Sequence, residues 1–192
     1  MNETLAFIVS FIAMVLIAAS YFFKKKEKYL LFQLLGIVFL MLSYFFTGEY
    51  FAMIGLGIAI MRTLVFFLYE KKEKTAPISL AFLFSALSVL AYFIVNFGIL
   101  RTAKPADIIY LSALFGYAFV FRIRNIKTVR FAVLIPTTLS IVYNVVIEAV
   151  PFVIISYAFE LGANIVSIFK YHVFHKKIKR KAFKGVYTYE KY

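Results

Sequence analysis

The chain contains no cysteine and no tryptophan among its 192 residues, and only 4 prolines. Without cysteine it can form no disulfide, thiol nucleophile or cysteine-ligated metal site. Acidic residues are also scarce, because 9 Asp and Glu stand against 22 Lys and Arg. Hydrophobic residues make up 64% of the chain, far above the roughly one half that is usual in soluble proteins. So short a chain cannot bury this much apolar surface in water, so we expect it to lie in a membrane.

The N-terminus lacks the basic segment that opens a secretory signal peptide. Residues 1–4 carry Glu3 and no Lys or Arg, and the first basic block follows the first apolar run. We therefore expect the first helix to be retained and to enter the membrane with its N-terminus outside.

Seven apolar runs are long enough to cross the roughly 30 Å hydrocarbon core as helices of about 20 residues. They cover residues 5–23, 29–46, 50–69, 77–100, 106–121, 131–150 and 151–170, of which 106–121 is the shortest. The predicted fold is all-α, a polytopic membrane protein with seven transmembrane helices.

Positive charge is confined to one side of these predicted spans. Residues 24–28, 71–74, 122–130 and 170–192 hold 19 of the 22 Lys and Arg, whereas the opposite side holds Arg101 and Lys104. Because basic loops face the cytosol, the N-terminus is predicted outside and the C-terminus in the cytosol. The net charge of +13 lies in blocks between apolar runs, so the expected partners are anionic lipid headgroups rather than nucleic acid.

Tyrosine is expected to replace tryptophan in the aromatic belt at the membrane surface. Six tyrosines lie near predicted span ends: Tyr21, Tyr29, Tyr50, Tyr69, Tyr110 and Tyr171.

The two halves of the chain share their order of helices, loops and charges. A shift of 97–98 residues pairs Leu42-Ser43 with Leu139-Ser140, and a slightly larger shift brings Arg62 opposite Asn164. We predict one membrane domain over residues 1–192: parallel three-helix bundles in 5–75 and 106–175, a linker helix in 76–105, and a basic cytosolic tail in 176–192. In such repeat folds the substrate site lies between the halves, near the middle of the membrane.

Two short motifs and two polar positions carry a resemblance to a known family. They are IMRT at residues 60–63, IVYNVVI at residues 141–147, and Glu160 and Asn164 before a basic tail. Over most of its length the chain resembles the YgjV-type bacterial inner-membrane family. The resemblance implies a multi-pass protein of the bacterial inner (plasma) membrane, and it implies no substrate. The layout is similar to that of SWEET and PQ-loop transporters, but the first, second and fifth predicted spans lack the prolines that act as hinges there.

Two ionisable residues lie deep inside predicted spans, where each costs about 2.5–3.5 kcal/mol. Arg62 is eight residues before Glu70 and Glu160 ten before Lys170, or roughly 12 and 15 Å from the cytosolic end at 1.5 Å per residue. Asn164 shares a helix face with Glu160. We predict that Arg62, Glu160 and Asn164 bind solute, with Asn144 near an outer entrance. The predicted supporting residues are Gln33, Asn96 and Ser156.

These residues permit two interpretations. In the first, Arg62 binds an anionic or hydroxylated solute, and Glu160 is its counter-ion or a proton site. In the second, Arg62 and Glu160 form a structural ion pair that fixes the register of their helices. Arg62 could also extend alone toward the cytosol.

The sequence favours a small-solute transporter or facilitator of unknown substrate. The alternative is a non-transporting scaffold or receptor-like membrane protein, and a homo-oligomer is possible in either case. An enzyme is not expected, because no catalytic set is present and Glu148 and Glu160 lie at different depths. No cofactor or metal is expected either, since His172 and His175 have no matching ligand cluster.

Overall fold

The structure is a computed structural model that describes residues 3–48, 50–99, 104–149 and 151–174. These residues form seven α-helices and no strand, which confirms the all-α prediction. The helices are α1 (Glu3–Ser20), α2 (Lys26–Thr47), α3 (Tyr50–Lys71), α4 (Ile78–Phe93), α5 (Asp107–Arg122), α6 (Ile126–Val146) and α7 (Pro151–Ile168). Short π-helical segments, η1 (Ile94–Ile99) and η2 (Phe169–Phe174), extend α4 and α7. The predicted tail 176–192 lies outside the described residues.

Two helices begin in basic loops, before the apolar runs that predicted them. Helix α2 begins at Lys26 and α6 at Ile126, rather than at residues 29 and 131. At the start of α6 the Asn125 side chain accepts a hydrogen bond from the Lys127 backbone N–H at 3.0 Å, a typical N-cap. The start of a helix therefore depends on groups such as the Asn125 cap, whereas hydropathy identifies only the segment of the helix that is apolar enough to contact lipid.

Five helical segments are long and apolar enough to cross a membrane: Lys26–Thr47, Ala52–Lys71, Ile78–Phe97, Ile126–Val146 and Pro151–Tyr171. A shorter apolar helix covers Thr4–Ser20. Helix α5 has 16 residues and so extends about 24 Å. The membrane class of the protein is therefore clear, while the count of seven spans stays a prediction.

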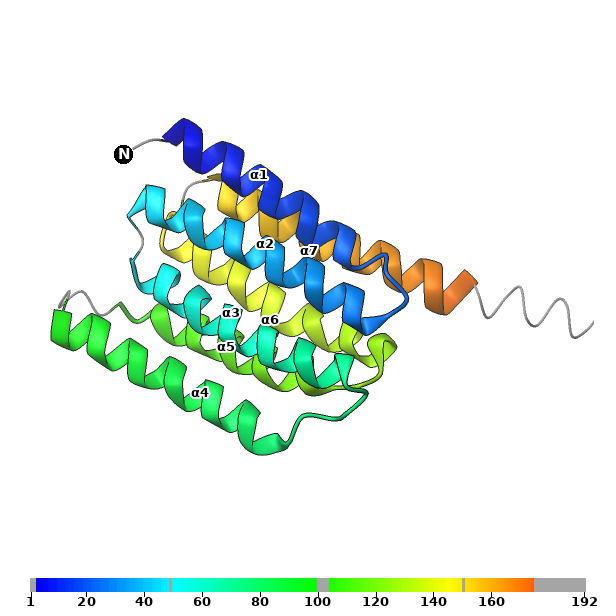
Figure 1. The fold of residues 1–192 in the computed structure, drawn as a ribbon. Helices are drawn as coiled ribbons and strands as arrows, with labels where there is room; N and C mark the ends of the chain where they lie inside the picture. The colour runs from blue at the N-terminus through cyan, green and yellow to red at the C-terminus, as the bar shows by residue number, and fades with distance from the viewer. Residues whose placement is uncertain (1–2, 49, 100–103, 150, 175–192) are drawn as a thin grey trace, which may run out of the picture.

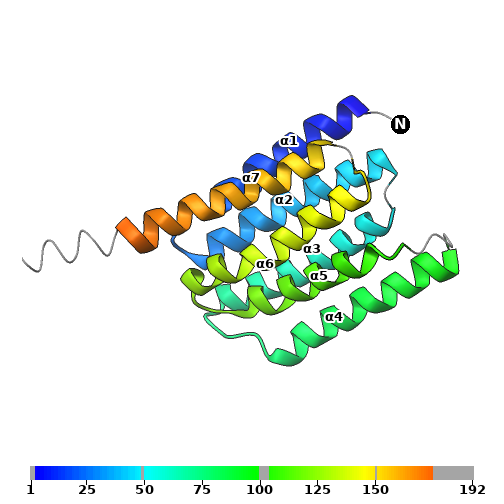
Figure 2. The same cartoon turned by 180° about the vertical axis from the view of Figure 1, so that it is seen from behind.

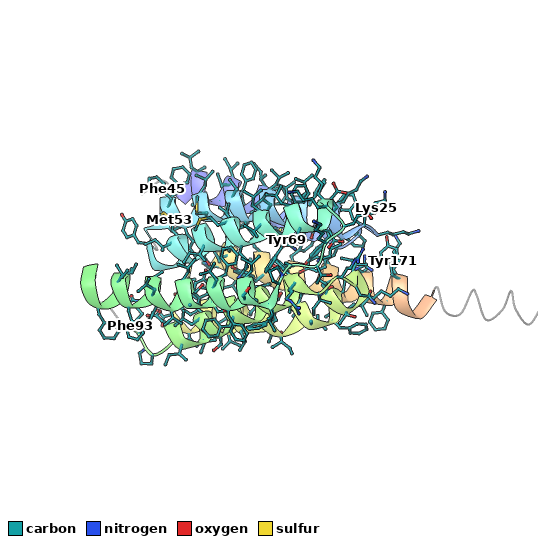
Figure 3. The ribbon with its side chains drawn as sticks, turned by 60° about the horizontal axis from the view of Figure 1, so that its bottom comes forward. Lys25, Phe45, Met53, Tyr69, Phe93 and Tyr171 are labelled. Carbon is teal, nitrogen blue, oxygen red and sulfur yellow. The ribbon has the colours of Figure 1, made fainter. Side chains whose placement is uncertain are left out.

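The surface of the bundle is apolar and its interior is partly polar. Ile135 is 68% exposed and Phe82 59%, and Figure 3 shows Phe45 and Phe93 among many apolar side chains that project outward. In contrast, Gln33 and Asn144 are buried. This distribution suits a surrounding of lipid, where polar groups find partners only between helices.

Six helices form a closed ring. Helices α1, α2 and α3 lie side by side in one layer, and α7, α6 and α5 lie in a second layer behind it (Figures 1 and 2). Contacts of α1 with α7 and of α3 with α5 join the layers, while α4 packs outside against α5 and α3. The division into two bundles and a linker helix stays a prediction. Each of these two helix contacts between the layers joins the first helix of one predicted bundle to the third helix of the other.

Burial recurs along the chain at a fixed spacing. Buried alanines 100 residues apart occupy matching places in α1 and α5, as in Ala13 and Ala113. Between α3 and α7 the spacing is 101 residues. Thr63 then matches Asn164, and the position that matches Arg62 holds no polar residue. The spacing of 97–98 expected from residue identities was therefore wrong, because identities arise by chance in so apolar a chain and burial does not.

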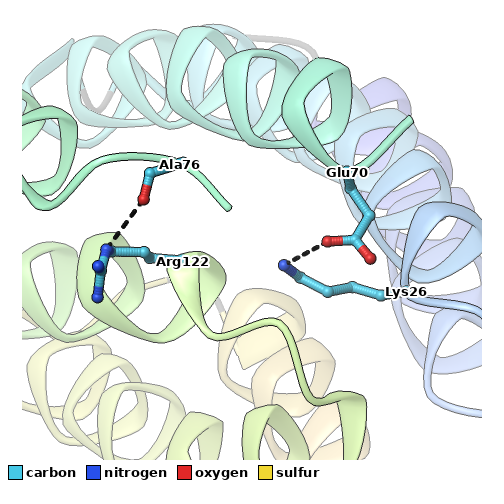
Figure 4. A network of polar contacts seen from close by, with 4 residues as sticks. All are labelled: Lys26, Glu70, Ala76 and Arg122. Atoms are coloured by element: carbon cyan, nitrogen blue, oxygen red, sulfur yellow. Dashed lines mark hydrogen bonds and ion pairs between the residues drawn. The ribbon is translucent and has the colours of Figure 1, made fainter. Parts of the chain in front are cut away.

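Polar contacts tie together the end of the bundle where the basic loops meet (Figure 4). The Lys26 ammonium lies 2.9 Å from the Glu70 carboxylate and so joins α2 to α3. The Arg122 guanidinium donates to the Ala76 carbonyl at 3.0 Å and so joins α5 to the segment before α4.

The expected tyrosine belt is only partly present. Tyr50 is exposed, but Tyr21, Tyr29 and Tyr110 are fully buried between helices. The prediction was wrong for these three, because their hydroxyls and rings contact the protein interior instead of headgroups.

Candidate functional site

A small cavity lies at the centre of the six-helix ring. Its volume is about 40 Å³, which is room for little more than one water molecule. Among the described residues, every α-helix except α4 lines it, through Ile17, Gln33, Ile37, Leu40, Leu56, Ala59, Arg62, Tyr110, Leu114, Tyr117, Phe121, Ser140, Tyr157 and Glu160. Nearly all of these residues are buried, so the cavity lies inside the bundle.

Equivalent positions of the two halves line this cavity. Four pairs spaced by 100 or 101 residues contribute: Ile17 and Tyr117, Leu40 and Ser140, Leu56 and Tyr157, Ala59 and Glu160. In each pair the first half supplies an apolar side chain and the second half a polar one. The cavity thus lies where the two halves meet, and most of its polar wall belongs to the second half.

Arg62 brings a buried positive charge to the cavity from the middle of α3. Its side chain is 2% exposed, and Nη1 donates to the Leu114 carbonyl at 2.9 Å. The guanidinium also lies 5.9 Å from the ring centre of Tyr117 and 5.5 Å from that of Phe121, within the range of cation–π attraction. Its Nε has no hydrogen-bond partner among the described residues. The buried guanidinium therefore keeps at least one donor whose hydrogen bond is not satisfied by the described residues.

Glu160 brings a buried carboxyl group from α7. It is 4% exposed, and its Oε1 accepts a hydrogen bond from the Tyr21 hydroxyl at 2.6 Å. Tyr157, one turn earlier on α7, also lines the cavity. The group is thus held by a neutral donor rather than by a cation.

Arg62 and Glu160 line the same cavity without pairing. Within the described ranges the ion pair that forms is Lys26 with Glu70, at the basic end of the bundle. Tyr117 lies beside Arg62, with its ring centre 5.9 Å from the guanidinium, and its hydroxyl lies 2.9 Å from that of Thr137. The structure thus gives each charge its own neutral partners, and it shows no direct Arg62–Glu160 bridge in the part it describes.

The other predicted residues divide into two groups. Gln33 lines the cavity, and its Nε2 donates to the Ser20 hydroxyl at 3.0 Å. Asn164, Asn144, Ser156 and Asn96 are buried but are not among the residues that line the cavity.

The four residues of this second group lie in different places. The Asn164 amide donates to the Arg130 carbonyl at 2.7 Å, and Asn144 accepts from the Tyr44 hydroxyl at 2.9 Å. Ser156 donates to a carbonyl of its own helix. Asn96 lies in η1, outside the ring, where its Nδ2 finds no partner among the described residues.

Three cavity tyrosines, Tyr110, Tyr117 and Tyr157, were not predicted as site residues. A signal for two of them was present, since Tyr110, Leu114, Tyr117 and Phe121 follow one another at spacings of four, three and four residues. That spacing places all four on one helix face. Tyr157 stands three residues before Glu160 and so shares its face.

Aromatic side chains close the cavity toward both ends of the bundle. At the basic end the ring centres of Tyr21 and Tyr29 lie 5.5 Å apart, and those of Tyr29 and Phe121 6.0 Å apart. At the other end Tyr110 stacks on Tyr143 with ring centres 4.8 Å apart.

Comparison with known proteins gives one match. The profile of the Imp-YgjV family, described as a bacterial inner membrane protein, matches residues 4–174. No curated protein and no solved structure matches the chain.

Proposed function

Because the chain belongs to the YgjV family of bacterial inner membrane proteins, we propose that it moves a small polar solute across that membrane. One observation carries the proposal. Arg62 and Glu160, of opposite charge, are both buried on the wall of one central cavity and are not paired with each other.

The energy of burial explains why this observation favours a solute site. Placing an ionisable side chain deep in a membrane costs about 2.5–3.5 kcal/mol, and a structural ion pair recovers part of that cost through mutual attraction. Arg62 and Glu160 instead have separate neutral partners, and the Arg62 Nε lacks any among the described residues. A polar solute that contacts both groups would supply the missing interactions.

The arrangement of helices supports transport. Two layers related by a spacing of 100 or 101 residues meet at the cavity, as in transporters that place their site between repeats. Separating the tyrosine layer at one end and then the other would expose the cavity alternately to each side.

The proposed orientation places the basic loops in the cytosol. In Figures 1 and 2 the loops α1–α2, α3–α4 and α5–α6 lie at the end where α7 finishes. Residues 24–28, 71–74 and 122–130 on this side hold 11 of the 22 Lys and Arg, which supports an orientation with the N-terminus outside and the C-terminus inside. Anionic headgroups contact the basic loops, and no catalytic role is proposed.

A comparison of metabolites tests the proposal. Cells that lack the protein and cells that overproduce it should differ in the internal or external level of at least one small solute. Arg62→Gln and Glu160→Gln should each strongly reduce that difference while the protein stays folded in the membrane. Arg124→Gln and Glu27→Gln are matched controls, because they neutralise the same groups outside the cavity and should preserve the difference.

Two outcomes would overturn the proposal. If no solute differs, the non-transporting scaffold is correct. If either single substitution removes folded protein and Arg62→Leu/Glu160→Leu restores it, the two residues form a structural pair.

A further inference from the structure

We infer that the solute is a small zwitterion of the amino-acid type, whose carboxylate binds Arg62 and whose ammonium binds Glu160. This inference rests on the proposed transport function and names its class of substrate. It follows from the charges of the cavity wall and from the distribution of its aromatic and apolar residues.

Arg62 offers a carboxylate a free edge. Its Nη1 is engaged by the Leu114 carbonyl, whereas its Nε has no partner among the described residues. A carboxylate prefers two parallel hydrogen bonds from one edge of a guanidinium, and such charge-assisted bonds are about twice as strong as neutral ones. The backbone bond and the rings of Tyr117 and Phe121 hold the guanidinium in place, so its orientation is fixed before a solute arrives.

Glu160 offers an ammonium group a carboxyl in an aromatic surrounding. One of its oxygens accepts from Tyr21, and no Lys or Arg within the described ranges forms an ion pair with it. Tyr110, Tyr117 and Tyr157 line the same cavity, and the faces of such rings attract cations.

The two charges together exclude other solutes. A solute with only a negative charge would leave the carboxyl of Glu160 facing a charge of the same sign, and one with only a positive charge would face Arg62. A neutral solute would leave both buried charges without a counter-charge, which is costly. Ile17, Ile37, Leu40, Leu56 and Leu114 complete the wall and suit an aliphatic side chain once the cavity opens.

Vesicles reconstituted with the full-length protein test this inference. One set receives a mixture of the twenty protein amino acids, a second set their amides, and a third set their N-acetyl derivatives. The amides keep only the ammonium charge and the N-acetyl derivatives only the carboxylate charge. Mass spectrometry of the vesicle contents, corrected for protein-free vesicles, measures uptake.

We expect one or more amino acids to enter more than about tenfold faster than the matching amide or N-acetyl derivative, a ratio that corresponds to 1.4 kcal/mol. Arg62→Gln should remove the preference over the amide and Glu160→Gln the preference over the N-acetyl derivative. If Arg62 and Glu160 had only structural roles, the two substitutions would not each remove a different preference.

The remaining outcomes separate the inference from the proposed function. If an N-acetyl derivative or an amide enters as fast as its amino acid in the unmodified protein, the zwitterion inference is wrong and transport stands. If none of the three mixtures enters, but solutes from a bacterial cell extract do, the inference is again wrong. If neither the mixtures nor the extract yields uptake by folded protein, both proposals fail.

Discussion

The hydroxyl of Tyr21 shows how much a single group contributes to this interior. It donates to Glu160 at 2.6 Å, and both residues are shielded from solvent. We predict that Tyr21→Phe lowers the free energy of unfolding by about 1–3 kcal/mol, because it leaves a buried carboxyl without this donor. Thermal unfolding followed by circular dichroism measures the effect.

Thr63→Val is the matched control for that substitution. The Thr63 hydroxyl is fully buried and has no hydrogen-bond partner among the described residues. Removing it should leave stability unchanged or slightly raised. Equal losses in the two variants would mean that the Tyr21–Glu160 bond contributes nothing specific.

Gly36 allows α2 to approach α1 closely. A Cβ there would collide with the Ile17 side chain and lie 3.3 Å from the Ala13 carbonyl oxygen. We predict that Gly36→Ala destabilises the protein by about 1–3 kcal/mol, the usual cost of overpacking. Because Ile17 lines the cavity, this variant should also slow transport.

Gly162→Ala is the corresponding control on α7. Nothing lies within 4 Å of a Cβ at Gly162, and alanine favours helix by roughly 1 kcal/mol. Its melting temperature should therefore equal or exceed that of the unmodified protein. If Gly162→Ala destabilised the protein as much as Gly36→Ala, the close contact between α1 and α2 would not explain the effect at Gly36.

At the scale of elements, the pair of Lys26 and Glu70 joins α2 to α3. Both side chains are largely shielded, with exposures of 6% and 19%. We predict that Lys26→Met or Glu70→Met alone destabilises the protein more than the double substitution, because each single change leaves an unpaired charge. A double-mutant cycle on the free energy of unfolding measures the coupling, and additive losses would show that the pair is not coupled.

The same scale shows where sequence reasoning reached its limit. The apolar runs placed the middle of every described helix correctly, since lipid selects for hydropathy alone. They missed the starts of α2 and α6, because Lys26 and Asn125 belong to loops by composition and to helix structure by capping and pairing. The spacing of the halves was likewise visible only from burial.

At the scale of the whole molecule, the absence of cysteine permits a direct test of topology. Single substitutions Lys72→Cys, Lys104→Cys and Arg124→Cys introduce exposed thiols on either side of α4 and α5. If both helices span the membrane, a membrane-impermeant maleimide added to whole cells labels only the cysteine at position 104. Labelling at 72 or 124 in intact cells would contradict the predicted orientation or the count of seven spans.

The membrane class of the protein and the two ionisable residues of the candidate site could be predicted from the sequence. Arg62 and Glu160 are conspicuous because charge in an apolar run is rare and costly. The tyrosines of the cavity could not be separated from tyrosines of a membrane belt, because the same residue type serves both purposes and only packing distinguishes them. That Asn164 bonds to Arg130 and Asn144 to Tyr44, rather than lining the cavity, likewise depends on the three-dimensional packing.

The matched positions Ala59 and Glu160 show a consequence of the difference between the two layers. Ala59 stands one helical turn from Arg62, so a glutamate there would neutralise the arginine within its own helix. Because the carboxyl is instead on α7, both Arg62 and Glu160 can contact the proposed solute. The two layers therefore match in burial but differ in charge on the cavity wall, with Arg62 on one layer and Glu160 on the other.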